Sequence, residues 1–282
     1  MTRRDWLGAA IIVPYYAATV LGHLEFSLWL VKRRTSDLFG VFKFADFLPP
    51  AALLAALAIA IWQFRRAAAG SRRLATIAAW AIWLLPAIAY DRLLTFSFAE
   101  TIHYPQYALL AMLLARFTDP ERTHFVFGPI LLSLTVLGIA DEALQYTWIT
   151  VSYSHYFDFN DIVLNLLAGI GGLLLYYGFP RQPAVEPERR EWRRALVGLA
   201  VLGLVLASFV LGIRAYDQRR PMPLIEREVS YGAWIPGPHT GRYYVLPPLP
   251  GTLLLISLAA LGSAAPLLFR SSSTANHAAR SY

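Results

Sequence analysis

Within the long apolar segments of the chain and at their ends, most of the side chains that can do acid–base chemistry come from three short stretches. The stretches contain Glu100, His103, Gln106 and Tyr107; then Asp141, Glu142 and Gln145; then Asp158, Asp161 and Asn165. Carboxyl and imidazole groups transfer protons as general acids and bases, and side-chain amides orient a substrate through hydrogen bonds. The three stretches therefore predict a site that binds a polar group or catalyses a reaction on it.

The spacing within each stretch fits an α-helix. Glu100, His103 and Tyr107 recur at intervals of three and four residues, which places them on one helical face. Asp161 and Asn165 share a face for the same reason. Each stretch is thus expected to present its polar groups on one side of a helix.

The elements that must position these residues are membrane helices. Hydrophobic residues make up 57% and charged residues 15% of the 282 residues, whereas soluble domains carry about 25% charged residues. A lipid-exposed span must satisfy its backbone hydrogen bonds internally, which a helix does. The sequence predicts an all-α fold, a polytopic transmembrane helical bundle of about eight spans. They cover residues 6–31, 47–64, 74–90, 101–116, 125–141, 161–177, 195–213 and 252–269.

The basic residues predict the orientation of these spans. When the spans alternate in direction, most Lys and Arg residues fall on the same side as the N-terminus. Because cytoplasmic loops carry the excess of basic residues, we expect a multi-pass protein of the cell membrane with both termini cytoplasmic. The polar ends of the spans at 101–116, 125–141 and 161–177 then lie together at the outer interface, and His23 and Glu25 lie in the outer half of the first span.

Position relative to the helix ends separates the acids. Glu100 and Asp158 are close to helix N-termini, where the helix dipole favours negative charge, so a capping role also explains them. Glu142 lies near a helix C-terminus, where a carboxylate opposes the dipole. It therefore needs a cationic partner or a raised pKa, and His103 is the expected partner for both Glu142 and Asp161.

The motifs in these stretches resemble the VanZ-like family of integral membrane proteins. The similarity rests on E-T-I-H-Y-P-Q-Y at 100–107, D-E-x-x-Q at 141–145 and D-x-x-x-N-x-x-x-G at 161–169, and it covers residues 90–179. His155 and Gln106 stand where relatives carry arginine and glutamate, so an ion pair between these positions is not expected. The resemblance implies a role at the cell envelope without an established reaction. Resistance to the glycopeptide teicoplanin, which the founding member confers, links the family to antibiotic resistance.

The chain divides into five predicted parts. These are three N-terminal spans (1–89), the VanZ-like core (90–179), a charged cytoplasmic linker (180–194), a C-terminal pair of spans (195–270) and a polar tail (271–282). The long outer loop at 214–250 is expected to form an irregular lid, because Gly232, the Pro-Gly-Pro at 236–238 and Gly241 predict turns. Gly169, Gly171 and Gly172 lie in an apolar span and predict close helix packing.

Three functions fit this arrangement. In the first, Glu142 or Asp161 is a general base and His103 an acid, acting on a lipid-linked cell-wall precursor or another envelope substrate. Bound membrane lipid is the expected partner, and the substrate-binding residues are Glu100, Gln106, Asp141, Gln145, Asp158 and Asn165. In the second, the polar groups form a non-enzymatic interhelical network. In the third, the acids are ion sites of a transporter or flippase.

Other partner classes have no support in the sequence. We predict no cofactor and no metal site, since no tight ligand motif is present and the chain has no cysteine. A metal held by Glu142, Asp141, His103 and Asp161 stays open as a variant of the first function. No nucleic acid is expected, because the basic residues form no stripe interleaved with aromatic residues.

Overall fold

The computed structural model describes residues 3–34, 37–38, 42–43, scattered positions within 51–65, 71–122, 124, 126–149, 156–177, 216–217, 220–221, 231–237 and 241–264. This part of the chain is mostly helical, as predicted. The helices are α1 (Arg3–Leu21), α2 (His23–Arg34), α4 (Ser71–Leu94), η1 (Phe98–Ile102), α5 (His103–Thr118), α6 (Phe127–Leu144), the π-helical turn η2 (Gln145–Ile149), α7 (Phe159–Tyr177) and α9 (Pro248–Ala264). Three antiparallel strand pairs join β1 (Asp37–Leu38) to β2 (Phe42–Lys43), β3 (Tyr216–Asp217) to β4 (Arg220–Pro221) and β5 (Trp234–Gly237) to β6 (Gly241–Tyr244).

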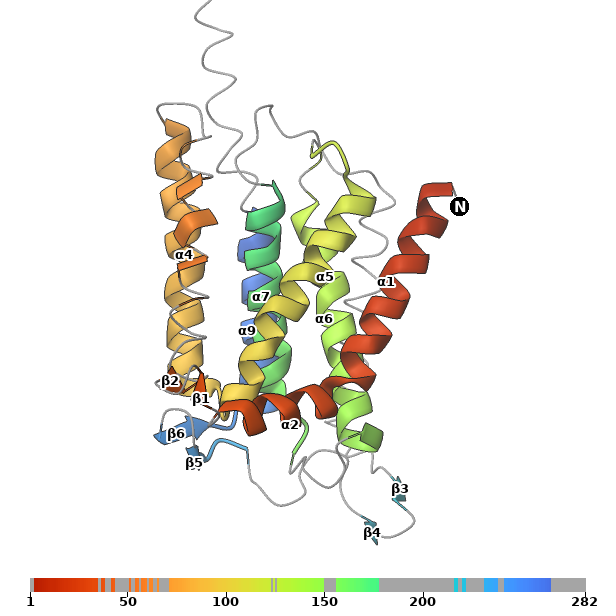
Figure 1. Cartoon of the computed structure of the whole chain (residues 1–282), viewed down its shortest axis with the longest axis vertical. Coiled ribbons are helices and arrows are strands. Elements are labelled where there is room, and N and C mark those ends of the chain that lie inside the picture. The colour runs from red at the N-terminus through yellow and green to blue at the C-terminus, as the bar shows by residue number, and fades with distance from the viewer. Residues whose placement is uncertain are drawn as a thin grey trace, which may run out of the picture.

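Helix α7 is the centre of the bundle. It packs against α4, α5, α6 and α9 (Figure 1). The C-terminal ends of α4 and α6 and the N-terminal ends of α5, α7 and α9 lie at one end of the bundle, the lower end in Figure 1. Helices α2 and η1 and the β5–β6 hairpin lie at this same end, which we name the hairpin end. The chain path therefore brings three polar helix ends into one region.

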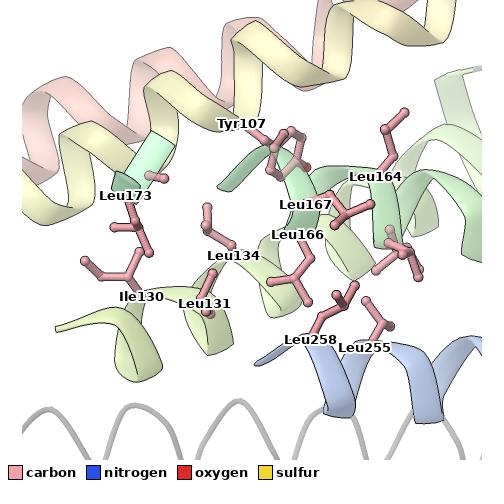
Figure 2. Close-up of a cluster of buried hydrophobic side chains, with 14 of the residues drawn as sticks. Tyr107, Ile130, Leu131, Leu134, Leu164, Leu166, Leu167, Leu173, Leu255 and Leu258 are labelled. Atoms are coloured by element: carbon pink, nitrogen blue, oxygen red, sulfur yellow. The ribbon is translucent and has the colours of Figure 1, made fainter. Parts of the chain in front are cut away.

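The interior of the bundle is a continuous apolar core. Figure 2 shows side chains from four helices that point into it: Tyr107 of α5; Ile130, Leu131 and Leu134 of α6; Leu164, Leu166, Leu167 and Leu173 of α7; Leu255 and Leu258 of α9. Lipid tails are as apolar as leucine, so close van der Waals contact rather than exclusion of water stabilises such a core within a membrane.

Glycines of α7 allow this close contact. A Cβ at Gly172 would collide with the backbone of Ala108, so α5 and α7 approach each other at backbone distance. A Cβ at Gly171 would lie 2.6 Å from the Trp83 ring of α4, and the Trp83 indole N–H donates a 2.7 Å hydrogen bond to the carbonyl oxygen of Leu167. The predicted packing role of Gly169, Gly171 and Gly172 is confirmed.

The outer faces of the bundle fit a membrane protein. By length and composition α6 and α7 can each cross a membrane, and α1 with α2 adds a third span if the bent pair counts as one. Large apolar side chains are exposed on α1, α4 and α9, among them Trp6 and Val13 of α1, Ile82 and Leu85 of α4, and Leu253 and Leu261 of α9. Soluble proteins rarely expose contiguous apolar surface of this kind. The predicted segments 180–194, 195–213 and 271–282, and most of 47–64, lie outside the described residues.

The first predicted span is not one continuous helix. Helices α1 and α2 meet at a 55° bend, and Gly22 lies between them. A Cβ at Gly22 would lie 2.7 Å from the Ala18 carbonyl oxygen, so glycine permits the tight connection. The bend turns α2 across the hairpin end, where it packs against η1 (Figure 1). The prediction of an uninterrupted helix over 6–31 was wrong because the apolar sequence continues on both sides of the bend.

The long loop predicted at 214–250 is more regular than expected. Its described part forms the β5–β6 hairpin, with Trp234 opposite Tyr244 and Gly237 opposite Gly241. Gly232 and Gly241 have φ of 81° and 89°, which suits glycine at turns. Pro236 and Gly237 lie within β5 instead of in a turn. A strand pair therefore replaces the irregular lid over these residues.

Candidate functional site

The predicted meeting of three polar helix ends is confirmed at the hairpin end. His103 begins α5 and Tyr107 follows one turn later, on the same face. Asp141 lies in the last turn of α6, and Asn165 lies in the second turn of α7. Hydrogen bonds join Tyr107 to Asp141 and His103 to Asn165, so α5 contacts both neighbours through polar groups.

One part of the site is a closed hydrogen-bond network around Asp141, which we name the Asp141 network. The Tyr107 hydroxyl donates to Asp141 Oδ2 at 2.8 Å, and Gln145 Nε2 donates to Asp141 Oδ1 at 2.8 Å. All three side chains are buried. Each carboxylate oxygen therefore has a donor, which is the usual condition of a buried structural carboxylate.

The second part, which we name the His103 cluster, consists of His103, Glu142, Asp161 and Asn165. His103 Nδ1 lies 2.8 Å from Asn165 Oδ1, and His103 Nε2 lies 3.6 Å from Asp161 Oδ2. If Nδ1 carries the proton donated to Asn165, Nε2 faces Asp161 with a lone pair unless the imidazole holds a second proton. The pair can thus share one exchangeable proton.

The His103 cluster is far from satisfied. Its four residues are each at most 9% exposed. Four of their polar atoms have no hydrogen-bond partner among the described residues: His103 Nε2, Glu142 Oε1, Asp161 Oδ1 and Asn165 Nδ2. Buried polar groups are nearly always hydrogen-bonded, because leaving one unpaired costs about 1–3 kcal/mol. Four such atoms make the cluster incomplete within the described part of the chain.

Glu142 differs from its expected arrangement. The ion-pair geometry of His103 within the described residues is with Asp161, and no ion pair there joins His103 to Glu142. Glu142 is buried, and its Oε1 has no hydrogen-bond partner in the described part of the chain. The predicted cationic partner of Glu142 is therefore not supplied by His103 in this arrangement.

Glu100 and Asp158 serve as caps. The Glu100 carboxylate accepts the backbone N–H groups of Phe96 and Ser97 at 2.7 and 3.1 Å. Asp158 Oδ1 accepts those of Asn160 and Asp161 at 2.7 and 3.4 Å, at the start of α7. Both acids therefore accept backbone N–H groups at helix starts, as the capping alternative predicted.

The pKa values of both capping acids are raised by burial and by neighbouring acids. Burial, followed by the Asp161 and Asp158 charges, raises the pKa of Glu100 well above its usual range. Burial and then the charge of Asp161 raise the pKa of Asp158 to about 8. The hairpin end is therefore an acidic environment that favours bound protons or cations.

Gln106 does not join either group. Its backbone carbonyl accepts a 2.8 Å hydrogen bond from the Tyr15 hydroxyl of α1, and its Oε1 is buried with no hydrogen-bond partner in the described part of the chain. It therefore connects α5 to α1 through the backbone and not to the acids. His155 lies outside the described residues.

Asn160 is an important residue that the sequence did not single out. Its Nδ2 donates to the carbonyl oxygens of Leu94 and Tyr244, both at 2.8 Å, and its Oδ1 accepts the N–H of Leu246 at 3.0 Å. Its own carbonyl accepts the Tyr90 hydroxyl at 2.8 Å. Asn160 thus ties the end of α4 and the hairpin to α7. An uncharged polar residue in the first turn of an apolar helix was the only signal for it.

His23 reaches the site because of the bend between α1 and α2. Its ring centroid lies 4.9 Å from that of His103, and Ser27 Oγ lies 3.3 Å from His23 Nε2. His23 is partly exposed and His103 is fully buried. His23 therefore lies beside the His103 cluster.

Aromatic residues cover the start of α7 next to the hairpin. The Tyr156 hydroxyl donates to the Tyr243 hydroxyl at 3.3 Å, and the Phe96 ring lies 4.8 Å from that of Tyr243. Burial raises the pKa of Tyr156 far above its usual range and that of Tyr243 to about 12, so both stay protonated at neutral pH. The hairpin is therefore held on the bundle by neutral hydrogen bonds and ring contacts.

The chemistry of the site is that of carboxylates, an imidazole and an amide. Within the described residues, no group of three or more His, Cys, Asp or Glu side chains is placed to hold a metal ion. The His103 cluster can bind hydrogen-bond donors through its carboxylates and can exchange a proton through its imidazole. Comparison of the chain with protein families, with characterised proteins and with solved structures gives no match.

Proposed function

We propose that this chain is a VanZ-like integral membrane protein of the cell envelope. In this proposal the His103 cluster binds, or acts on, the headgroup of a lipid-linked envelope substrate. The observation that carries the proposal is the set of four buried polar atoms without a partner in the described chain. A cluster that only oriented helices would be satisfied within the protein, as the Asp141 network is.

The proposal includes a membrane topology. We propose about eight spans, with both termini in the cytoplasm and the hairpin end at the outer face. Two observations support it: most basic residues fall on the side of the N-terminus, and the described helices alternate so that the polar ends of α5, α6 and α7 share one end of the bundle (Figure 1). A headgroup at the outer interface is then at the depth of the His103 cluster.

Each residue of the cluster has a role in this proposal. Glu142 or Asp161 is the general base, because both carry an oxygen free to accept a proton. His103 is the acid that exchanges a proton with Asp161, and Asn165 orients its ring. Gln145 belongs instead to the Asp141 network, so its expected contact with substrate is replaced by a positioning role.

Envelope lipids are the direct readout of this function. Mass spectrometry of lipids and lipid-linked glycans would compare cells that carry the wild type, a deletion or the double variant Glu142→Gln/Asp161→Asn at matched protein level. We expect one species to change in the deletion and in the double variant alike. Tyr107→Phe is the matched control, since it removes a buried polar group from the Asp141 network only. Teicoplanin susceptibility of the same strains tests the link to antibiotic resistance.

Either of two results would overturn the proposal. If the deletion alters a lipid and the double variant does not, the function lies outside the His103 cluster. If neither alters any envelope lipid, the non-enzymatic network becomes the better explanation.

A transporter or flippase is the second candidate, and the bend between α1 and α2 favours it. Broken helices frequently form ion and substrate sites in transporters, and here the bend brings His23 against His103. Proteoliposomes with an internal pH dye would test it. Proton movement under an imposed gradient, abolished by His23→Phe, would support transport; an impermeable vesicle would exclude proton-coupled transport.

A further inference from the structure

We propose that the His103 cluster accepts a primary ammonium group, so that the substrate is a lipid with an amine-bearing headgroup. This inference rests on the proposed function and names its substrate class. Glu142 Oε1 and Asp161 Oδ1 are buried acceptors without a hydrogen-bond partner in the described chain. What they lack is a donor, and an ammonium group supplies three N–H donors and a positive charge.

The charges at the hairpin end select against a phosphate inside the cluster. The carboxylates of Asp141, Asp158 and Glu100 all act on Glu142 together with Asp161. Among the described residues no Lys or Arg forms an ion pair with these acids, and the nearby basic groups are the imidazoles of His23 and His103. A phosphate would add further acceptor oxygens and negative charge to this acidic end, whereas an ammonium ion supplies N–H donors and pairs with an ionised carboxylate.

The Asn165 amide can provide a third acceptor. Rotating this amide by 180° keeps its hydrogen bond to His103, because Nδ2 then donates to Nδ1, and it turns Oδ1 to the position of the unpartnered nitrogen. With Nδ1 as the acceptor, the neutral imidazole carries its proton on Nε2, and this N–H points at Asp161. Glu142, Asp161 and Asn165 then offer three acceptor oxygens, the number that one primary ammonium group can fill.

Space next to the amide is available on α6. A Cβ at Gly138, one turn before Glu142, would lie 3.5 Å from Asn165 Nδ2, which is ordinary van der Waals contact. Gly138→Ala therefore narrows the site beside Asn165 without removing a polar group and without a backbone collision. This variant changes the space in the site while all charged groups stay in place, and we expect it to fold.

Lipid binding to the purified full chain tests the proposal. The protein would be placed in nanodiscs of phosphatidylcholine that contain added phosphatidylethanolamine or phosphatidylglycerol, and retained lipid would be measured by native mass spectrometry. We expect about ten times more phosphatidylethanolamine to be retained than phosphatidylcholine, whose quaternary nitrogen has no N–H. The same preference is expected over phosphatidylglycerol, which is anionic and has no amine. The unfolding temperature of the protein would also be measured with free ethanolamine. A rise in this temperature would show that the amine alone is recognised.

The variants decide where the amine binds. Glu142→Gln/Asp161→Asn and Gly138→Ala should each reduce the preference, and Tyr107→Phe should keep it. An unchanged preference in both of the first two variants would assign the amine to surrounding lipid and overturn the inference. Preferential retention of phosphatidylglycerol would overturn the amine while leaving headgroup binding intact, and no preference for any lipid would count against the proposed function as well.

Discussion

Two neighbouring acids at the end of α6 have opposite environments. Asp141 receives a hydrogen bond on each carboxylate oxygen, from Tyr107 and from Gln145. Glu142, the next residue along the chain, has an oxygen that is buried without a hydrogen-bond partner in the described structure. Both side chains are almost fully buried. The difference therefore lies in their partners and not in their access to solvent.

This contrast separates two groups of polar side chains that meet at the same turn of α6. The Asp141 network is complete and holds α5 against α6. The His103 cluster is incomplete, because four of its buried polar atoms have no hydrogen-bond partner in the described chain. Incomplete buried networks are costly, so they persist where a ligand, an ion or water completes them. We infer that the first group maintains the fold and that the second performs the function.

The largest expected effect comes from breaking the frame that both groups share. Gly172→Ala places a Cβ against the backbone of Ala108, which forces α5 and α7 apart. Overpacking usually costs about 1–3 kcal/mol and more when backbone must move, so we expect loss of the monodisperse protein in size-exclusion chromatography. Gly138→Ala, which makes only ordinary contacts, is the control, and equal behaviour of the two would show that the close approach is not required.

A smaller effect distinguishes the two acids themselves. Asp141→Ala leaves the Tyr107 hydroxyl and the Gln145 amide without their acceptor, so the free energy of unfolding should fall by about 2–4 kcal/mol. Glu142→Ala removes an uncompensated carboxylate and should change it by less than about 1 kcal/mol. Reversible unfolding in detergent would measure both variants. A greater loss for Glu142→Ala than for Asp141→Ala would contradict the assignment of roles.

Removing one hydrogen bond of the Asp141 network should lower the free energy of unfolding by less than Asp141→Ala does. Tyr107→Phe deletes one hydrogen bond and keeps the ring in the core, which predicts a loss of about 1 kcal/mol. In the Asp141→Ala background the same substitution should cost nearly nothing, because its partner is already gone. A double-mutant cycle measures this coupling directly, and additive effects would show that the bond contributes nothing to stability.

A separate expected effect is a pH dependence of stability from the capping acid Asp158. Its pKa is raised to about 8 in the folded protein, against about 3.9 in an unfolded chain. The folded state thus binds the proton more tightly, and stability should fall as pH rises from about 4 to about 8. Asp158→Asn keeps the capping oxygen and removes the titration, so its unfolding temperature should vary less over this range. An identical pH profile for variant and wild type would rule out Asp158 as the source.

Much of the site follows from helical spacing and membrane topology. The intervals between Glu100, His103 and Tyr107, and between Asp161 and Asn165, predict polar faces on successive spans. Alternation of the spans then brings those faces to one end of the bundle. These features are local or follow from chain direction, which is why the sequence predicts them. The caps at Glu100 and Asp158 were predictable for the same reason.

Other features depend on contacts between distant parts of the chain. The bend at Gly22 is set by how α2 packs on η1, and apolar composition is the same on either side of it. The role of Asn160 depends on Leu94, Tyr244 and Leu246, which are remote in sequence. Which of the two adjacent acids is satisfied depends on the partner helices. Spacing alone treats Asp141 and Glu142 alike.

The most direct test of the central claim is an experimental structure of the purified protein in lipid, at a resolution that shows ordered water and bound headgroups. We predict density that belongs to no protein side chain within about 3 Å of Glu142 Oε1 and Asp161 Oδ1, and none bridging to Asp141. If both oxygens are instead bonded to protein side chains with no other density beside them, the His103 cluster is a completed structural network and the proposed division of roles is wrong.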